Sequence, residues 1–151
     1  MIELFNFTTL TNKEHQLVLA WRNSQNISRY MHTKLITLKE HIAFVDTLKY
    51  NHQKSYFLVK DDGDSIGVIY LVDTFLGLYA NPERKKVGDL LLEQIITFAF
   101  DVKKLSSLKA EVFKENLSAV KLYKRFSFKT MQENEQLQIM ELKKIDYNRR
   151  F

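Results

Sequence analysis

A basic run, Arg84, Lys85 and Lys86, stands shortly before Gly88 in the stretch "ANPERKKVGDLLLEQI". The apolar spacing after Gly88 predicts that a helix begins there. Backbone N–H groups at a helix N-terminus have no partner within the helix and carry the positive end of its dipole, so they can bind a phosphate. A solvated basic loop is the alternative interpretation.

Two further polar residues could do chemistry. Glu111 lies within the apolar strand pattern "LKAEVF", where a carboxylate should avoid the core. Its side chain therefore faces either a cleft or the solvated surface. Asn116 precedes the helical pattern "LSAVKLYKRF" and is a plausible helix N-cap. The four histidines show no metal-ligand spacing with carboxylates, so no metal is predicted.

The elements that would position these residues follow from the apolar periodicity of the first half. "FNFTT" alternates as a first strand, and "NKEHQLVLAWRNS" has helical spacing. Thr37 and Glu40 form a capping box that opens a second helix, which runs to about Tyr50. "SYFLVK", "DDGD" and "SIGVIYLV" indicate a hairpin that turns at Gly63, and "FLGLYA" is a third extended run.

The second half begins with the helix predicted from Gly88 to about Lys103. The strand "LKAEVF", a short helix after Asn116, and the closing strands "FKTM" and "LQIMEL" follow. The predicted order is β-αα-βββ-α-β-α-ββ. Three consecutive strands without crossover helices imply antiparallel pairing and exclude a pure Rossmann alternation. We therefore expect an α+β (mixed α/β) fold.

The composition favours one compact domain over residues 1–151, with 45% apolar and 13% aromatic residues. With no cysteine, the chain has no disulfide, thiolate nucleophile or zinc–cysteine site, and a cytoplasmic location is expected. Neither a signal peptide nor an apolar run of about 18 residues is seen, so no membrane association is expected.

The net charge of +5 favours an anionic partner but does not distinguish nucleic acid from a phosphorylated small molecule. No known nucleic-acid motif occurs, and the basic residues are scattered, so nucleic acid is the less favoured partner.

The element order and the string "EVFKENLSAVKLYKRFSF" resemble the GNAT superfamily of acyl-CoA-dependent N-acetyltransferases, in particular its pattern "N..A..LY...GF". Ser127 stands at the glycine of that pattern, and Lys86 at the middle glycine of the family's phosphate-loop signature. The resemblance implies the GNAT fold, with a central, mostly antiparallel twisted sheet flanked by helices, and acetyl-CoA as co-substrate. Lysine at a glycine position puts the close approach of the backbone in question, although its ammonium can pair with a phosphate.

Acetyl transfer from a thioester to an amine needs a neutral amine, an oxyanion site and a proton for the leaving thiolate. The resemblance makes Tyr123 the general acid beside the sulfur, with ring packing on the central helix as the alternative. Glu111 would draw the amine's proton through water, and Asn116 would bind the pantetheine or a water unless it only caps the helix. The implied cofactor-binding residues are Leu78, Tyr79, Ala80, Lys85, Lys86, Val87, Gly88, Asp89, Leu90, Asn116, Ala119 and Tyr123.

A narrower similarity lies in "WRNSQNISRYMHTKLITLKEHIAFVDTL", followed by "YFLV", "IGVI" and "LGLYANP". These stretches resemble bacterial acetyltransferases that modify a UDP-linked 4-amino sugar on the way to pseudaminic acid, and less closely the peptide- and ribosomal-protein-modifying relatives. The connection from Val72 to Leu76 is shorter than in those relatives, so either the hairpin is tight or residues are absent. The implied substrate-binding residues are Arg22, Met31, His32, His41, Phe44 and Tyr79.

These substrate residues have distinct expected roles. Arg22 suits a diphosphate, because its planar guanidinium binds bidentately, and His41 could donate to a phosphate. Met31 and Phe44 could sandwich a uracil ring. On an amphipathic helix without the family context, Phe44 would instead be an ordinary core residue.

The leading functional hypothesis is a metal-free enzyme that moves acetyl from acetyl-CoA to the 4-amino group of a UDP-linked amino-deoxy sugar. The acceptor would be of the UDP-4-amino-4,6-dideoxy-N-acetyl-altrosamine type, in pseudaminic acid biosynthesis for flagellin glycosylation. Without a nucleophilic Cys or a Ser elbow, a direct ternary-complex reaction is expected. The alternatives are a ribosomal-protein or peptide N-terminal acetyltransferase and a non-catalytic basic binding module. A monomer or homodimer is expected.

Overall fold

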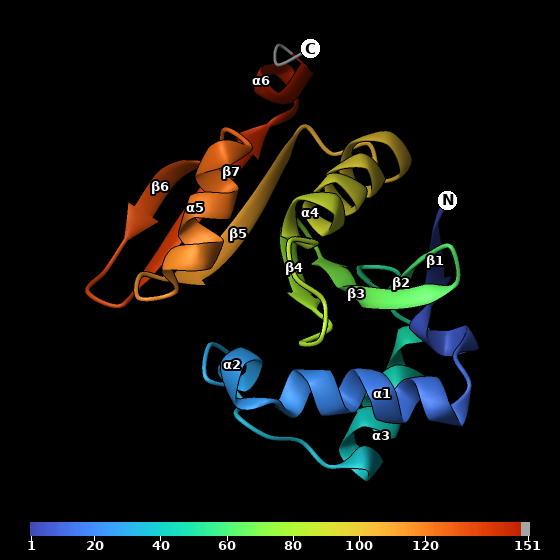
Figure 1. Ribbon diagram of the computed structural model, residues 1–151. Coiled ribbons are helices and arrows are strands. Elements are labelled where there is room, and N and C mark those ends of the chain that lie inside the picture. The colour runs from blue at the N-terminus through green and yellow to red at the C-terminus, as the bar shows by residue number, and fades with distance from the viewer. Residues whose placement is uncertain (149–151) are drawn as a thin grey trace.

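The computed structural model describes residues 1–148 of the chain. Their strands form one sheet in the order β1-β2-β3-β4-β5-β7-β6 (Figure 1). The strand bounds are β1 (Ile2–Asn6), β2 (Lys54–Asp61), β3 (Asp64–Val72), β4 (Phe75–Ala80), β5 (Ser107–Phe113), β6 (Lys129–Glu133) and β7 (Leu137–Lys143). Every neighbouring pair is antiparallel except β4 and β5, so the predicted mostly antiparallel sheet is confirmed.

The helices form two layers on the sheet (Figure 1). Their bounds are α1 (Asn12–Asn23), α2 (Gln25–Ser28), α3 (Leu38–Leu48), α4 (Gly88–Thr97), α5 (Leu117–Arg125) and α6 (Lys144–Asn148), with a 3₁₀ helix η1 (Phe7–Thr9) and a π-helix η2 (Phe98–Val102). Helices α1 and α3 cover one face with a core that includes Val18, Val45 and Leu58, all buried. Helices α4 and α5 cover the other face with the larger core, which includes Leu91 and Ile95.

The predicted helix starts hold in the structure. The Thr37 hydroxyl accepts a hydrogen bond from the Glu40 N–H at 3.1 Å, while the Glu40 carboxylate accepts one from the Thr37 N–H at 2.9 Å. This capping box satisfies N-terminal donors of α3 from both sides. Gly88 begins α4 as predicted, and the helical stretch runs on through η2 to Val102.

The first strand was predicted too late in the chain. β1 spans Ile2–Asn6, and Phe7–Thr9, which the alternation of "FNFTT" assigned to the strand, forms the 3₁₀ helix. The Asn6 side chain accepts a hydrogen bond from the Thr8 N–H at 2.9 Å, and such a local bond turns the chain away from the strand. Phe7 is buried within the 3₁₀ helix, and an apolar residue at this position is equally compatible with a strand, so its apolar character did not distinguish the two.

The connection after Val72 is a tight hairpin. Val72 pairs with Phe75, which leaves only Asp73 and Thr74 in the turn. Asp73 has φ +54°, the left-handed conformation that such two-residue turns require and that aspartate tolerates. The Thr74 carbonyl accepts a hydrogen bond from the Lys109 N–H at 2.8 Å, so the turn also joins β4 to β5.

Candidate active site

The sheet opens between its two parallel strands. Phe75 and Lys109 are the only residues of β4 and β5 paired in register within residues 1–148, and beyond them the strands separate (Figure 1). The opening is part of a cleft with a volume of about 1330 Å³. The cleft is lined by β4, β5, α5, the start of α4, and the segment from α1 to α3. Every predicted site residue except Lys85 and Leu90 lines this cleft.

The backbone of β4 presents donors to this opening. The Asn81 N–H donates to the Ile66 carbonyl of β3 at 2.9 Å, whereas the Thr74 carbonyl faces β5. Because backbone groups alternate sides along a strand, the N–H groups of Leu78 and Ala80 point toward the opening and that of Tyr79 points toward β3. Of the three cofactor-binding residues that the resemblance implies on β4, Leu78 and Ala80 therefore direct their N–H groups to the opening, and Tyr79 lines the cleft with its side chain.

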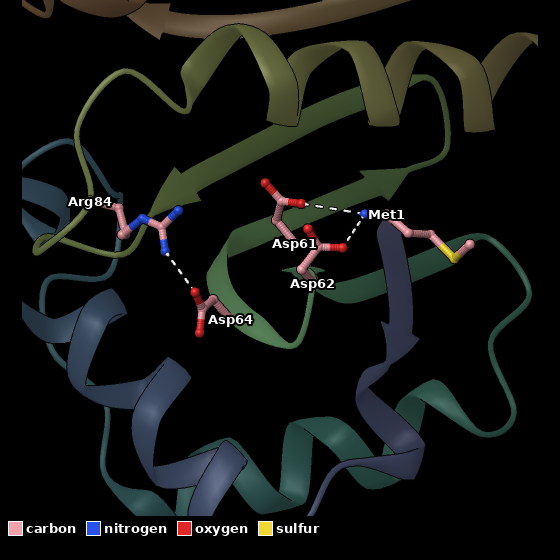
Figure 2. A network of polar contacts seen from close by, with 5 residues as sticks. All are labelled: Met1, Asp61, Asp62, Asp64 and Arg84. Carbon is pink, nitrogen blue, oxygen red and sulfur yellow. Dashed lines mark hydrogen bonds and ion pairs between the residues drawn. The ribbon is translucent and has the colours of Figure 1, made fainter.

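A rigid turn leads from β4 to α4. The Asn81 side chain donates to the Ser65 carbonyl at 3.1 Å and accepts from the Glu83 N–H at 3.0 Å. Arg84 forms an ion pair with Asp64 at 3.6 Å, close to the N-terminal amine paired with Asp61 and Asp62 (Figure 2). The guanidinium of Arg84 is thus held toward the β2–β3 hairpin.

The N-terminus of α4 is an open anion site. Its N-cap residue, Val87, makes no side-chain cap bond, and the Val87 carbonyl accepts the first helical bond from the Leu91 N–H at 2.9 Å. The preceding N–H groups of Gly88, Asp89 and Leu90 are therefore available to a ligand. Lys86 has φ +62°, so the backbone takes the glycine-like conformation of the family signature although the residue is lysine.

A carboxylate also lies at this helix start. The Arg125 guanidinium donates to the Asp89 carboxylate at 2.5 Å, linking α5 to α4. This ion pair offsets the negative charge that would otherwise oppose a phosphate at the same helix end. Lys85 and Lys86 are exposed and add positive charge beside it.

Tyr123 is buried in α5 with only 6% of its surface exposed. Its hydroxyl has no hydrogen-bond partner within residues 1–148. Every fully buried side-chain oxygen or nitrogen in that range has a partner, so this hydroxyl is not fully buried and is accessible from the cleft that Tyr123 lines. Burial, reinforced by the nearby Tyr70, raises the pKa of Tyr123. The phenol therefore stays protonated at neutral pH, as a proton donor must.

Asn116 and Ala119 form the start of α5. The Asn116 side chain accepts a hydrogen bond from the Ala119 N–H at 3.4 Å, so the predicted N-cap is present. Both residues line the cleft. The amide nitrogen of Asn116 remains available to a ligand, since the cap uses only the oxygen.

Glu111 meets the histidine predicted for the substrate side. The Glu111 carboxylate lies 2.6 Å from the His32 Nε2, with both side chains partly exposed in the cleft. The strand position thus turns Glu111 toward the cleft and not toward the outer surface. His32 also lies against Phe113, with 5.8 Å between ring centroids.

Two predicted phosphate contacts have protein partners in this structure. Arg22 donates to the carbonyls of Thr33 and Lys34, the latter at 2.7 Å, and so fixes the segment between α2 and α3. His41 is 4% exposed, and its Nε2 is 3.1 Å from the His15 Nδ1. Burial, together with His15, lowers the pKa of His41 to about 4. Burial thus favours the neutral imidazole at pH 7, which can still donate one hydrogen bond.

Aromatic residues cover the floor of the acceptor side. Phe44 packs edge-on against Tyr56 at 4.9 Å between centroids, half-buried like Met31. Tyr79 is almost fully buried, and burial raises its pKa.

The sequence interpretation missed Tyr56 and Tyr70, whose rings stack at 4.6 Å with an interplanar angle of 5°. Their period-two position in the predicted hairpin strands was the available signal.

No group of three or more His, Asp, Glu or Cys side chains that could hold a metal occurs in the part of the chain that the structure describes. None of the helices within residues 1–148 is long and apolar enough to span a membrane.

Comparison with known proteins defines the class. Residues 16–128 match the model of the acetyltransferase (GNAT) family, and the chain belongs to that family. It is therefore an acetyl-CoA-dependent N-acetyltransferase, as predicted. Among curated proteins, it is similar to the acetyltransferase PseH of two Campylobacter jejuni strains. One is 41% identical over 97% of this chain and 96% of the relative, and the other 43% over 85% of each.

Solved structures agree with this assignment. The crystal structure of the Campylobacter jejuni N-acetyltransferase PseH in complex with acetyl coenzyme A superimposes with a TM-score of 0.83 and 37% identity, covering 95% of this chain and 99% of that one. A Vibrio cholerae spermidine N-acetyltransferase, solved with CoA and spermine, has a TM-score of 0.85 at 17% identity, covering 97% and 98%. The second likeness shows the shared fold alone.

Proposed function

We propose that this enzyme transfers acetyl from acetyl-CoA to the 4-amino group of a UDP-linked amino-deoxy sugar, in the biosynthesis of pseudaminic acid for flagellin glycosylation. The observation that carries the proposal is the 41% identity to an acetyltransferase PseH over nearly the whole of both chains. The basic balance of the chain supports an anionic acceptor. The absence of cysteine fits a reducing cytoplasm, which is the proposed location.

In this proposal, acetyl-CoA lies in the opening between β4 and β5. The α4 N-terminus, with Lys85 and Lys86, binds the pyrophosphate. The pantetheine runs along β4 as an added strand would, and passes Asn116 and Ala119. The N–H groups of Leu78 and Ala80 hold the thioester carbonyl and stabilise its oxygen as negative charge develops.

The chemical step is a direct attack by the acceptor amine. Glu111 draws a proton from the amine through water, and the neutral nitrogen forms a bond to the carbonyl carbon. As the tetrahedral intermediate collapses, the carbon–sulfur bond breaks and Tyr123 gives its proton to the thiolate. A second proton passes from the new amide nitrogen to water, and exchange with solvent removes the proton from Glu111 and returns one to Tyr123. The products are the N-acetyl sugar and CoA.

The acceptor would bind on the α1–α3 side of the sheet. Met31 and Phe44 are half-buried there and offer faces to a uracil ring. Arg22 keeps part of its guanidinium for a diphosphate while it fixes the Thr33–Lys34 backbone. His32, Tyr79 and the neutral His41 would supply the remaining polar contacts.

The test measures free-thiol release from acetyl-CoA by the purified enzyme with four additions: a UDP-4-amino-deoxy sugar, N-terminal peptides, spermidine, and no acceptor. We expect release only with the nucleotide sugar. Release only with peptides would replace the proposal by an N-terminal acetyltransferase. Silence in every sample, together with no binding of acetyl-CoA, would favour a binding module that has lost catalysis.

A further inference from the structure

The ring of Tyr70 in β3 lies over Gly77 of the neighbouring strand β4. Tyr56, Tyr70 and Gly77 are in register on β2, β3 and β4, so they form one row across the sheet. A Cβ atom on Gly77 would lie 1.9 Å from the Tyr70 Cζ and 2.3 Å from its hydroxyl oxygen. The ring of Tyr70 therefore occupies the space that any other residue at position 77 would need.

The Tyr70 ring also contacts a second aromatic ring. It stacks on Tyr56 at 4.6 Å with near-parallel planes, and Tyr56 is packed in turn against Phe7 and Phe44. The ring is thus clamped between Tyr56 and the Gly77 backbone. Such a clamp fixes the position of the hydroxyl beyond the ring.

The Tyr70 hydroxyl projects into the cleft. It has no hydrogen-bond partner among residues 1–148. Every fully buried side-chain oxygen in that range has a partner, so the Tyr70 oxygen is not fully buried and is accessible from the cleft that Tyr70 lines. Burial raises the pKa of Tyr70. The group therefore remains a neutral phenol, able to donate and accept.

The sheet register places this hydroxyl beside the reacting groups. Because Phe75 pairs with Lys109 in parallel, Gly77 is level with Glu111 across the opening and faces the same side. Gly77 also precedes Leu78, whose N–H is one of the two donors proposed to bind the thioester carbonyl. The Tyr70 hydroxyl, drawn over Gly77, therefore lies between the proposed proton acceptor and the acyl site.

We propose that Tyr70 is a specificity-determining residue whose hydroxyl hydrogen-bonds the acceptor sugar next to its reacting amine. An amino sugar offers hydroxyl and amide groups for such a bond. Gly77 is required because only a residue without Cβ admits the ring. This inference rests on the proposed nucleotide-sugar acceptor.

The decisive variant is Tyr70→Phe, which removes the hydroxyl and keeps the stacked ring. We expect KM for the UDP-amino sugar to rise about 5- to 10-fold, as for loss of one neutral hydrogen bond. KM for acetyl-CoA and the melting temperature should stay at the wild-type values. Tyr50→Phe is the matched control, because Tyr50 is 85% exposed and lies outside the cleft.

A second pair of variants tests the clamp. Gly77→Ala should displace the ring, lower the melting temperature and raise KM for the sugar; adding Tyr70→Ala should recover part of the melting temperature, because the clash is gone.

The outcomes separate the two proposals. No turnover of the nucleotide sugar by the wild type would overturn the proposed function and this inference with it. Wild-type turnover with an unchanged sugar KM in Tyr70→Phe would overturn only the role of Tyr70.

Discussion

His32 and Glu111 join the two sides of the cleft, with 2.6 Å between the imidazole Nε2 and the carboxylate. His32 comes from the segment between α2 and α3, and Glu111 from β5, so the contact crosses the site. Both side chains keep substantial exposure, 69% and 40%. In the proposed mechanism, the Glu111 carboxylate takes the amine's proton. It already has a hydrogen-bonding partner in His32, which an incoming amine must displace or use.

Glu111→Gln tests this carboxylate. Glutamine keeps the size and a hydrogen bond to His32 but cannot take up a proton at neutral pH, so we expect kcat to fall about 10²-fold. Initial rates of thiol release at saturating substrates measure the effect. Glu135→Gln, at an exposed position in the turn before β7, is the matched control and should keep the wild-type kcat. Equal rates for wild type and Glu111→Gln would remove Glu111 from the mechanism.

Tyr123→Phe tests the proposed general acid. The variant keeps the ring that packs at 5.2 Å from Phe128 and loses only the proton that the thiolate would receive. We expect kcat to fall about 10²-fold, while acetyl-CoA binds with unchanged affinity. Rates and calorimetric titration with acetyl-CoA separate the two effects. A full wild-type kcat would leave Tyr123 as a packing residue, the alternative reading of its position.

Much of the fold was predictable because local patterns and tertiary packing agree. The capping box at Thr37 and the glycine at the start of α4 are local signals, and both are kept in the structure. The first strand was misplaced because Asn6 and Thr8 form a local bond that alternation alone does not reveal. The sequence left open whether the connection from Val72 to Leu76 is a tight hairpin or lacks residues. The number of residues in a connection does not determine its backbone conformation, and the left-handed Asp73 is seen only in the structure.

The site was predictable where side chains act from one element, and less so where two elements meet. Residues near Tyr123 follow a contiguous family pattern, and the cleft includes them. The His32–Glu111 contact spans 79 residues of sequence, so no spacing rule connects its members. Likewise, the role of Gly77 depends on its register with Tyr70, and register is a property of the assembled sheet.

Ser127→Gly should stabilise the protein. Ser127 stands at the glycine position of the family pattern and has φ +71°, a left-handed conformation that costs a non-glycine residue about 1 kcal/mol. We expect the free energy of unfolding to rise by about 1 kcal/mol and the melting temperature by about 2–4 °C. Ser118→Gly, at an exposed position in the first turn of helix α5, is the matched control and should lower stability by about 0.5 kcal/mol or less. A loss of stability in Ser127→Gly would contradict the strain argument.

The buried His15–His41 pair should make stability depend on pH. Burial lowers the pKa of both imidazoles, that of His41 to about 4, whereas an unfolded histidine titrates near 6.5. Below pH 6.5 the unfolded chain therefore binds protons that the folded chain does not. Stability is full above that pH and falls as the pH drops toward 4, by about 2 kcal/mol between pH 7 and pH 5. Urea unfolding at several pH values measures this loss.

His41→Gln assigns that loss to the pair. Glutamine is polar but does not titrate, so the free energy of unfolding should fall less steeply between pH 7 and pH 5 than in the wild type. His52→Gln, at an exposed histidine, should keep the wild-type slope. The pKa of Glu14 is lowered by its bond with Lys60, so Glu14 adds to the loss of stability only as the pH falls below the usual carboxyl range. The loss measured above pH 5 therefore reports on the histidines. An identical pH dependence of the unfolding free energy in wild type and His41→Gln would show that His41 takes up its proton in the folded chain as readily as in the unfolded chain, contrary to its burial.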